Sequence, residues 1–201
     1  MHTGYLSVTS NYMVGDYVLL TPRISLRPPR DTDAPSIFHC YASDPKVTRF
    51  VHWPTHSRID DTRAFLAFSA AEWLKWPAGP LLIESREDGR LLGSTGLNFE
   101  CSDVASTGYV LAQREWGVGF ASEALQAMVA LAKTLKVRRL YALCHARHAA
   151  SIRVLERCGF EIDALLEKHS VFPNLEDAAP QDVHRYVHPS PSEGLVIENW
   201  G

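Results

Sequence analysis

A short glycine loop, Trp116-Gly117-Val118-Gly119-Phe120-Ala121, stands directly before a helix-like run from Ser122 to Val129. Two glycines two residues apart let the backbone turn tightly and present its N–H groups to a ligand. The helix that follows adds unpaired N–H donors and the positive end of its dipole. The pattern predicts an anion site, and a pyrophosphate is the anion that fits it best.

The loop alone does not identify its ligand, because glycine turns before helices are common and many bind nothing. A dinucleotide-binding fingerprint is disfavoured, since it needs a third glycine where Ser122 stands and an acidic residue about 20 residues further on. The chain has no G-x-x-x-x-G-K-[ST] sequence, which excludes a P-loop. An empty turn and an anion cradle both remain open on these residues.

Composition limits the class of protein. With 201 residues, of which 46% are hydrophobic and 21% charged, the chain is long enough for one well-buried domain and short for two. A net charge of −3 and a pI of about 6.3 argue against a nucleic-acid partner. The start does not resemble a signal peptide, and no run approaches the roughly 18 apolar residues of a membrane span. We expect a cytoplasmic protein with no membrane partner.

Cysteine is scattered without CxxC spacing, at Cys40, Cys101, Cys144 and Cys158, which predicts reduced and mostly buried thiols. Cys144, His145 and His148 come nearest to a metal-ligand group. A closed zinc site needs four ligands, and no second Cys/His pair stands at ligand spacing, so we expect no metal.

The pattern of apolar residues predicts one domain with peripheral ends. Its helices are expected from Asp33, as the cap, through Tyr41, from Asp60 to Lys75, from Ala121 to Leu135, and from Ala149 to Cys158, where Gly159 stops the chain. The third has its core face at Leu125, Met128, Val129, Ala132 and Leu135. Strands are expected at 24–27, 81–84, 91–97, 107–111, 139–144, 160–166 and 183–187, with a hairpin turn at Asp88-Gly89. A flexible extension over residues 1–17 and a tail over residues 189–201 complete the chain.

Five segments resemble, in order and spacing, the GNAT superfamily of acyl-CoA-dependent N-acetyltransferases. Within it they are similar to the RimJ/RimL-type branch, which acetylates ribosomal-protein N-termini. The resemblance covers roughly Leu20 to His188 and depends on LTPRISLR at 20–27, FVHW at 50–53, GYVL at 108–111, WGVGFASEA at 116–124 and SIRVLERCGF at 151–160.

The resemblance implies an α/β (α+β) GNAT fold over residues 18–188. A mixed, mostly antiparallel sheet of six to seven strands is flanked by about four helices, and its central strands splay near Leu111 and Cys144 to admit the acyl arm. Acetyl-CoA is the implied co-substrate. It would lie against Tyr109, Val110, Leu111, Trp116, Gly117, Val118, Gly119, Phe120, Ala121, Ser122, His148 and Ser151.

The pyrophosphate loop of the superfamily can be aligned in two registers. Trp116, Gly119 and Ala121 match the Trp-Gly-x-Gly loop of the branch and leave the helix beginning near Ala121. In the second register, Arg114, Gly117 and Gly119 match the general superfamily pattern Gln/Arg-x-x-Gly-x-Gly/Ala. We prefer the first register, in which Trp116 lies near the phosphates.

The implied reaction is direct attack of a free amine on the thioester of acetyl-CoA. An ordinary ammonium, with a pKa of about 10, must first lose its proton. A backbone N–H near Val110 and Leu111 would stabilise the oxyanion. The departing thiolate, with a pKa of about 8.5, gains from a proton donor.

Ser151 is the expected proton donor, since the branch has a serine near the CoA sulfur one turn into this helix. Without the resemblance, a serine in a first turn is more often a cap or a solvated hydroxyl. Many members of the superfamily have a tyrosine acid four residues later, where this chain has Leu155.

The general base stays unassigned, because the branch commonly has a glutamate where this chain has Thr107. Glu100 and Asp103, before that strand, and His145, at the end of the next one, are the candidates. Loop carboxylates are usually only solvated surface groups. His148 replaces an asparagine that contacts the pantetheine arm, and its imidazole can bind the arm, act as a base or merely cap the helix.

The acceptor is expected to be a primary amine, either a peptide N-terminus or a small amine such as a polyamine or an aminoglycoside. Phe50, Trp53, Trp73 and Trp76 fall in the region that walls the acceptor cleft in this family, and they hold the acceptor or simply belong to the core. Two other classes of function remain. A CoA-binding sensor or interaction module without useful transferase activity is favoured by Thr107 and His148, and a structural homo-oligomer would bind no nucleotide. A homodimer is compatible with the sequence, which indicates no interface.

Overall fold

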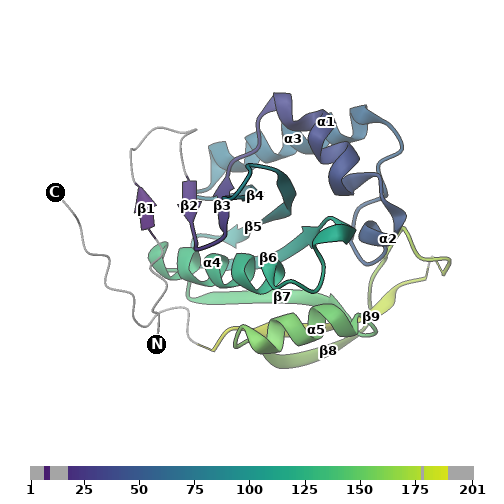
Figure 1. The fold of residues 1–201 in the computed structure, drawn as a ribbon. Coiled ribbons are helices and arrows are strands. Elements are labelled where there is room, and N and C mark those ends of the chain that lie inside the picture. The colour runs from purple at the N-terminus through teal and green to yellow at the C-terminus, as the bar shows by residue number, and fades with distance from the viewer. Residues whose placement is uncertain (1–6, 10–17, 178, 190–201) are drawn as a thin grey trace.

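The computed structural model describes residues 7–9, 18–177 and 179–189, which carry one mixed sheet (Figure 1). The sheet order is β1-β2-β3-β4-β5-β6-β7-β9-β8, and only the β6–β7 pair is parallel. The strands are β1 (Ser7–Thr9), β2 (Val18–Leu20), β3 (Ile24–Arg27), β4 (Pro80–Ser85), β5 (Leu91–Cys101), β6 (Val104–Leu111), β7 (Arg139–His145), β8 (Glu161–Ser170) and β9 (Gln181–Val187). The expected mixed, mostly antiparallel α/β fold is confirmed.

The expected strand count of six to seven was too low, because the described part of the chain has nine strands. All seven expected strands are present, and the two that were not expected, β1 and β2, have three residues each. Segments this short show no measurable alternation of apolar residues. Most of the expected extension and all but Pro189 of the expected tail lie outside the described residues, whereas Ser7–Thr9 pair with β2.

The helices of the described chain are α1 (Ala34–Ile37), α2 (Pro45–Thr48), α3 (Ile59–Lys75), α4 (Phe120–Thr134) and α5 (Ala149–Arg157), with short turns η1 (Asp31–Asp33), η2 (Phe38–Ala42) and η3 (Gln113–Glu115). Asp33 does not cap α1 with its side chain. Its carboxylate instead accepts hydrogen bonds from the Arg30 N–H, at 2.7 Å, and from the Arg27 guanidinium, at 2.8 Å. The unexpected helix α2 begins at a proline, with the Asp44 side chain as its cap.

Successive side chains of β4 point to opposite faces of the sheet, and both faces are packed against helices. Leu81 and Ile83 join a large core cluster with residues of α4, whereas Leu82 joins a second cluster with residues of α1 and α3. Figure 1 shows α1 and α3 gathered on one side of the molecule and α4 and α5 near β7 on the other. The sheet is therefore a central layer between two groups of helices.

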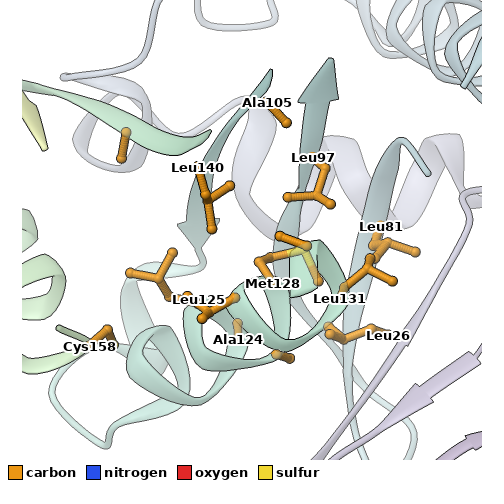
Figure 2. Packing of buried hydrophobic residues seen from close by; sticks show 14 of the residues in the cluster. Leu26, Leu81, Leu97, Ala105, Ala124, Leu125, Met128, Leu131, Leu140 and Cys158 are labelled. Atoms are coloured by element: carbon orange, nitrogen blue, oxygen red, sulfur yellow. The ribbon is translucent and has the colours of Figure 1, made fainter. Parts of the chain in front are cut away.

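Helix α4 anchors the larger core with the face that its sequence predicts. Leu125, Met128 and Ala132 are fully buried, Val129 is buried and Leu135 is partly buried. Figure 2 shows Leu125, Met128 and Leu131 directed toward strand residues such as Leu97 and Leu140. Full burial of one such large side chain is worth about 1.5–3 kcal/mol. This packing fixes the start of α4, and with it the glycine loop, against the end of β6.

None of the helices in the described ranges is both long and apolar enough to cross a bilayer. All four cysteines are free, with Cys144 and Cys158 buried, Cys40 half-buried and Cys101 exposed.

Candidate active site

Strands β6 and β7 pair over only part of their length. Their parallel pairs are Val104–Arg139, Ala105–Leu140 and Ser106–Tyr141. Beyond them, β6 continues to Leu111 along β5, and β7 continues to His145 along β9. The two strands therefore diverge in the middle of the sheet, as the splay expected near Leu111 and Cys144 requires.

A cleft of about 900 Å³ opens where the strands diverge. Its walls come from β6, β7, the α2–α3 segment, the glycine loop, the first turn of α4 and the helix α5. Most of the expected cofactor residues line it, and so do His145 and Ser151, whereas Val118, Phe120 and Glu100 do not. A cleft of this size is typical of a small-molecule site.

The glycine loop has the backbone that its sequence predicts. Gly117 and Gly119 have φ angles of 80° and 93°, in the left-handed region that only glycine adopts without strain. Gly119 is the N-cap of α4, so the unpaired N–H groups of the first helical turn follow directly. A Cβ at Gly117 would meet no atom within 4 Å, whereas one at Gly119 would lie 3.2 Å from Nη2 of Arg23. The loop thus presents bare backbone to the cleft.

Arg23, which precedes β3, bonds to both the glycine loop and α4, which follow it by 95 and 100 positions in the sequence. Its backbone N–H and Nε donate to the carboxylate of Glu123, at 2.8 and 2.7 Å, and Nη1 donates to the Val118 carbonyl at 2.9 Å. The Thr21 hydroxyl donates to the same carboxylate at 2.5 Å. Burial raises the pKa of Glu123, but these hydrogen bonds outweigh burial and lower it. Glu123 is therefore an ionised but fully engaged carboxylate beside the start of α4.

Two hydroxyl groups from different walls meet inside the cleft. The phenol of Tyr109, on β6, donates toward Oγ of Ser151, on α5, across 3.4 Å. Burial raises the pKa of Tyr109 to about 12, so the phenol stays protonated near neutral pH. Burial also raises the pKa of the Cys144 thiol, and a hydrogen bond with Ser151 partly opposes this effect. Ser151 thus lies among neutral hydrogen-bonding groups rather than among charges.

His145 is enclosed at the end of β7. Its Nδ1 accepts the Arg147 N–H at 3.0 Å, and its buried Nε2 has no hydrogen-bond partner among the described residues. The ring centroids of Phe50 and Phe172 lie 4.8 and 4.7 Å from the centroid of the imidazole. Burial lowers the pKa of His145, with the cations of Arg147 and Arg49 contributing. Because Nδ1 accepts, the neutral ring carries its proton on Nε2, which favours a donor over a base.

His148 is the N-cap residue of α5, but its side chain makes no capping hydrogen bond. The imidazole lines the cleft and stacks on Phe50, with 4.6 Å between ring centroids. Burial lowers the pKa of His148, and the neighbouring His145 adds to the effect. A neutral imidazole that lines the cleft can accept a proton near neutral pH.

The other candidate bases lie elsewhere or are engaged. Glu100 accepts a hydrogen bond from the Tyr141 phenol, and Asp103 accepts one from Arg138. Neither carboxylate lines the cleft. The Thr107 hydroxyl donates to the Gly96 carbonyl at 2.8 Å and so belongs to the sheet. Within the described part of the chain, no group of three or more His, Cys, Asp and Glu side chains is arranged to hold a metal ion.

The four aromatic residues expected at the acceptor wall divide into two pairs. Phe50 and Trp53 line the cleft. Trp73 and Trp76 instead pack against the larger core, where Trp73 donates to the Pro80 carbonyl at 2.8 Å and Trp76 stacks on Phe99. At the end of α3 these two side chains pack toward the sheet. Helical spacing alone could not show whether they belong to the core or to the cleft.

Asn174, in the loop between β8 and β9, holds the cleft wall that contains Trp53, and no sequence pattern indicated this role. Its amide nitrogen donates to the carbonyls of Thr48 and Trp53, at 2.7 and 2.9 Å. Its amide oxygen accepts the Thr55 N–H at 2.7 Å. These bonds join the end of α2 and the segment after it to a loop more than 100 residues away. No local pattern marks such a contact.

The chain matches the family model described as Acetyltransferase (GNAT) domain over residues 23–161. It is 29% identical, over 75% of its length and 86% of the relative, to an uncharacterized N-acetyltransferase p20 of Bacillus licheniformis. It is also 27% identical to an uncharacterized N-acetyltransferase, YoaA, of Bacillus subtilis (strain 168), over 88% of this chain and 98% of the relative.

Solved structures share the fold at lower identity. An acetyltransferase (GNAT family) from Bacillus anthracis has a TM-score of 0.74 and 22% identity, covering 85% of this chain and 96% of its own. An acetyl transferase of Salmonella typhimurium that modifies the N-terminal serine of L7/L12 has a TM-score of 0.72 and 19% identity, covering 83% and 94%. A spermidine N-acetyltransferase from Vibrio cholerae, in complex with CoA and spermine, has a TM-score of 0.69 and 16% identity, covering 82% and 94%.

Proposed function

The chain belongs to the acetyltransferase (GNAT) domain family, and from this premise we propose that it moves an acetyl group from acetyl-CoA to a primary amine within the cleft between β6 and β7. The observation that carries the proposal is the divergence of these strands beside the bare glycine loop at the start of α4. A phosphate site and a channel for a long acyl arm thus lie in one continuous cleft.

The residues present fit acetyl-CoA. The positive φ angles of Gly117 and Gly119 and the N-terminus of α4 suit a pyrophosphate, because they present backbone N–H groups and no side chain. The edge of β6 that faces away from β5 suits the amides of a pantetheine arm. Trp116, whose Nε1 donates to the Leu111 carbonyl at 2.9 Å, lines the same cleft beside the loop.

Acetyl transfer forms an N–C bond, breaks the C–S bond of the thioester, and passes one proton from the amine and one to the departing sulfur. Ser151 supplies the second proton or a hydrogen bond in its place, with the Tyr109 phenol donating toward its oxygen. His148, whose low pKa keeps the imidazole neutral, accepts the proton of the amine. His145, with its proton held on Nε2, helps to shape the wall.

The acceptor is a primary amine, on a protein N-terminus or on a small molecule. The neighbour from Salmonella typhimurium modifies an N-terminal serine, and that from Vibrio cholerae is a spermidine N-acetyltransferase. Both kinds of acceptor therefore occur on this fold.

Calorimetric titration of the full chain with acetyl-CoA is the first experiment, followed by detection of acetylated product by mass spectrometry with a panel of amines. We expect micromolar binding that Ser151→Ala retains and Gly119→Val loses while remaining folded. No heat and no thermal stabilisation by acetyl-CoA would overturn the proposal.

One observation favours a second candidate, a CoA-binding sensor without useful turnover. Thr107 stands at the position of the expected glutamate, and its hydroxyl is engaged by the sheet. Tight binding of acetyl-CoA with no product from any amine in the panel would favour this candidate.

A further inference from the structure

The wall of the cleft built by the α2–α3 segment and the end of β7 is aromatic. It contains four aromatic rings and three imidazoles, from Phe50, Trp53, Phe65, Phe68, His52, His145 and His148. Phe68 is 52% exposed although it is a large apolar residue. Apolar and aromatic side chains that gather along a cleft, as these rings do, are typical of a surface that a ligand covers.

This wall offers no carboxylate to a ligand. Among the described residues that line the cleft, only Glu115 and Arg157 have ionisable side chains of the Asp, Glu, Lys and Arg types. Glu115 is buried, and Arg90 and Arg114 already neutralise it, at 3.3 and 3.1 Å. Arg157 ends α5 next to Cys158, whose thiol contacts the Ser122 carbonyl in the first turn of α4. Arg157 therefore lies toward the proposed phosphate site.

Around Phe50 and His145, cations outnumber carboxylates. The Arg49 guanidinium lies 5.2 Å from the centroid of the Phe50 ring. Arg147, which follows β7, and Arg49 both lower the pKa of His145 through their positive charge. The carboxylate of Asp182 has the opposite effect on this pKa. Burial lowers the pKa values of His52, His145 and His148, so the three imidazoles are uncharged near neutral pH.

We propose, building on the acetyl transfer proposed above, that the acceptor carries a single primary amine on an uncharged aromatic or aliphatic body, and that polyamines are poor acceptors. The aromatic wall buries the body and holds the one reacting ammonium before it loses its proton. Each further ammonium of a polyamine would lose water without gaining a carboxylate, and Arg49 would repel it.

The fold does not decide between these classes of acceptor, because the spermidine N-acetyltransferase from Vibrio cholerae has it too. The choice depends on the side chains of the wall. A single carboxylate placed there should therefore shift the preference toward a polycation.

The test compares initial rates of the full chain with 2-phenylethylamine and with spermidine, at equal ionic strength and saturating acetyl-CoA. We expect kcat/KM for 2-phenylethylamine to exceed that for spermidine by at least tenfold. An equal or greater value for spermidine would overturn this inference and leave the acetyl transfer intact.

A matched pair of variants at Phe68 makes the test specific. Phe68→Glu and Phe68→Gln remove the same ring from an exposed helical position and differ only in charge. We expect kcat/KM for spermidine to be at least fivefold higher in Phe68→Glu than in Phe68→Gln, with 2-phenylethylamine used equally or less well. Equal use of spermidine by the two variants, with both folded and binding acetyl-CoA, would contradict the electrostatic argument.

Two further outcomes separate the proposals. Turnover of neither amine by a protein that binds acetyl-CoA would overturn this inference and leave the cofactor site standing. Failure to bind acetyl-CoA would overturn the proposed function from which the inference starts.

Discussion

The phenol oxygen of Tyr109 lies 3.4 Å from the hydroxyl oxygen of Ser151, although the two residues are 42 positions apart and come from β6 and α5. The contact is longer than the usual hydroxyl hydrogen bond of about 2.8 Å. The phenol, whose pKa burial raises to about 12, keeps its proton near neutral pH and donates it toward the Ser151 oxygen. The Ser151 hydrogen is then available for a third group.

Replacing Ser151 with Ala should lower kcat by about 10²-fold, because proton donation to the departing sulfur is lost. The affinity for acetyl-CoA should change by less than about threefold, since the hydroxyl is not part of the phosphate site. Steady-state kinetics and calorimetric titration give the two numbers. An unchanged kcat would remove Ser151 from the mechanism.

Tyr109→Phe removes one oxygen from the same pair and should lower kcat by about three- to tenfold. In a Ser151→Ala background, the same change should have little further effect, because the phenol acts through the serine. A double-mutant cycle on kcat measures this coupling. Full additivity would show that the two hydroxyls act independently.

Gly119→Ala should weaken acetyl-CoA binding at least tenfold. A Cβ there is strained by the φ of 93° and approaches Arg23 to 3.2 Å, and the loop must shift to relieve both. Gly89→Ala is the matched control, since Gly89 has a φ of 72° in open space, in the hairpin between β4 and β5. Both variants should lose stability, by about 1–2 kcal/mol. Equal losses of affinity in the two variants would show that general destabilisation, not the cradle, is responsible.

Arg23→Gln should weaken acetyl-CoA binding about tenfold, because it removes the guanidinium that neutralises the Glu123 carboxylate beside the start of α4, where an anion is to bind. Glu123→Gln alone should bind acetyl-CoA as well as the unaltered chain does. The double variant should recover most of the affinity lost in Arg23→Gln. A double variant no better than Arg23→Gln would assign the loss to the Val118 carbonyl, which Arg23 also holds at 2.9 Å.

The free energy of unfolding should fall as the pH is lowered from about 7 to 5. Burial lowers the pKa values of His52, His56, His145 and His148, so between their folded values and the unfolded value of about 6.5 the unfolded chain binds more protons. Each such proton gives a slope of up to about 1.4 kcal/mol per pH unit. Urea unfolding at several pH values measures the slope. His148→Asn should flatten it.

Local patterns predicted most of the fold because the physics that they report is local. Gly159, with a φ of 82°, follows α5 as a C-terminal cap, and Asp88-Gly89 makes the turn between β4 and β5. The buried face of α4 follows from 3.6-residue periodicity alone. By contrast, β2 exists because Leu19 lies opposite Leu26 in the sheet, and a three-residue strand has no period of its own.

The candidate site was only partly predictable, because its decisive contacts join distant segments. The glycine loop could be identified from its letters, but the ion pair of Arg23 with Glu123 spans 100 positions. Glu100 was a reasonable candidate base until β5 placed it against the Tyr141 phenol. Asn174 had no signal at all, since a single asparagine in a loop does not indicate which carbonyls it binds.

The early end of the β6–β7 pairing gives this sheet an interior edge. From Thr107 to Leu111, β6 keeps its partner β5 on one side, and on the other side the described part of the sheet has no strand beside it. The hydrogen-bonding groups of such an edge belong to the main chain, so they stay the same whichever side chains occupy the strand. An extended ligand rich in amides can complete the edge as one more strand, and sequence drift along β6 would leave that recognition intact. Selection against drift should then fall on Gly117 and Gly119 of the loop, whose positive φ angles a residue with a side chain adopts only with strain.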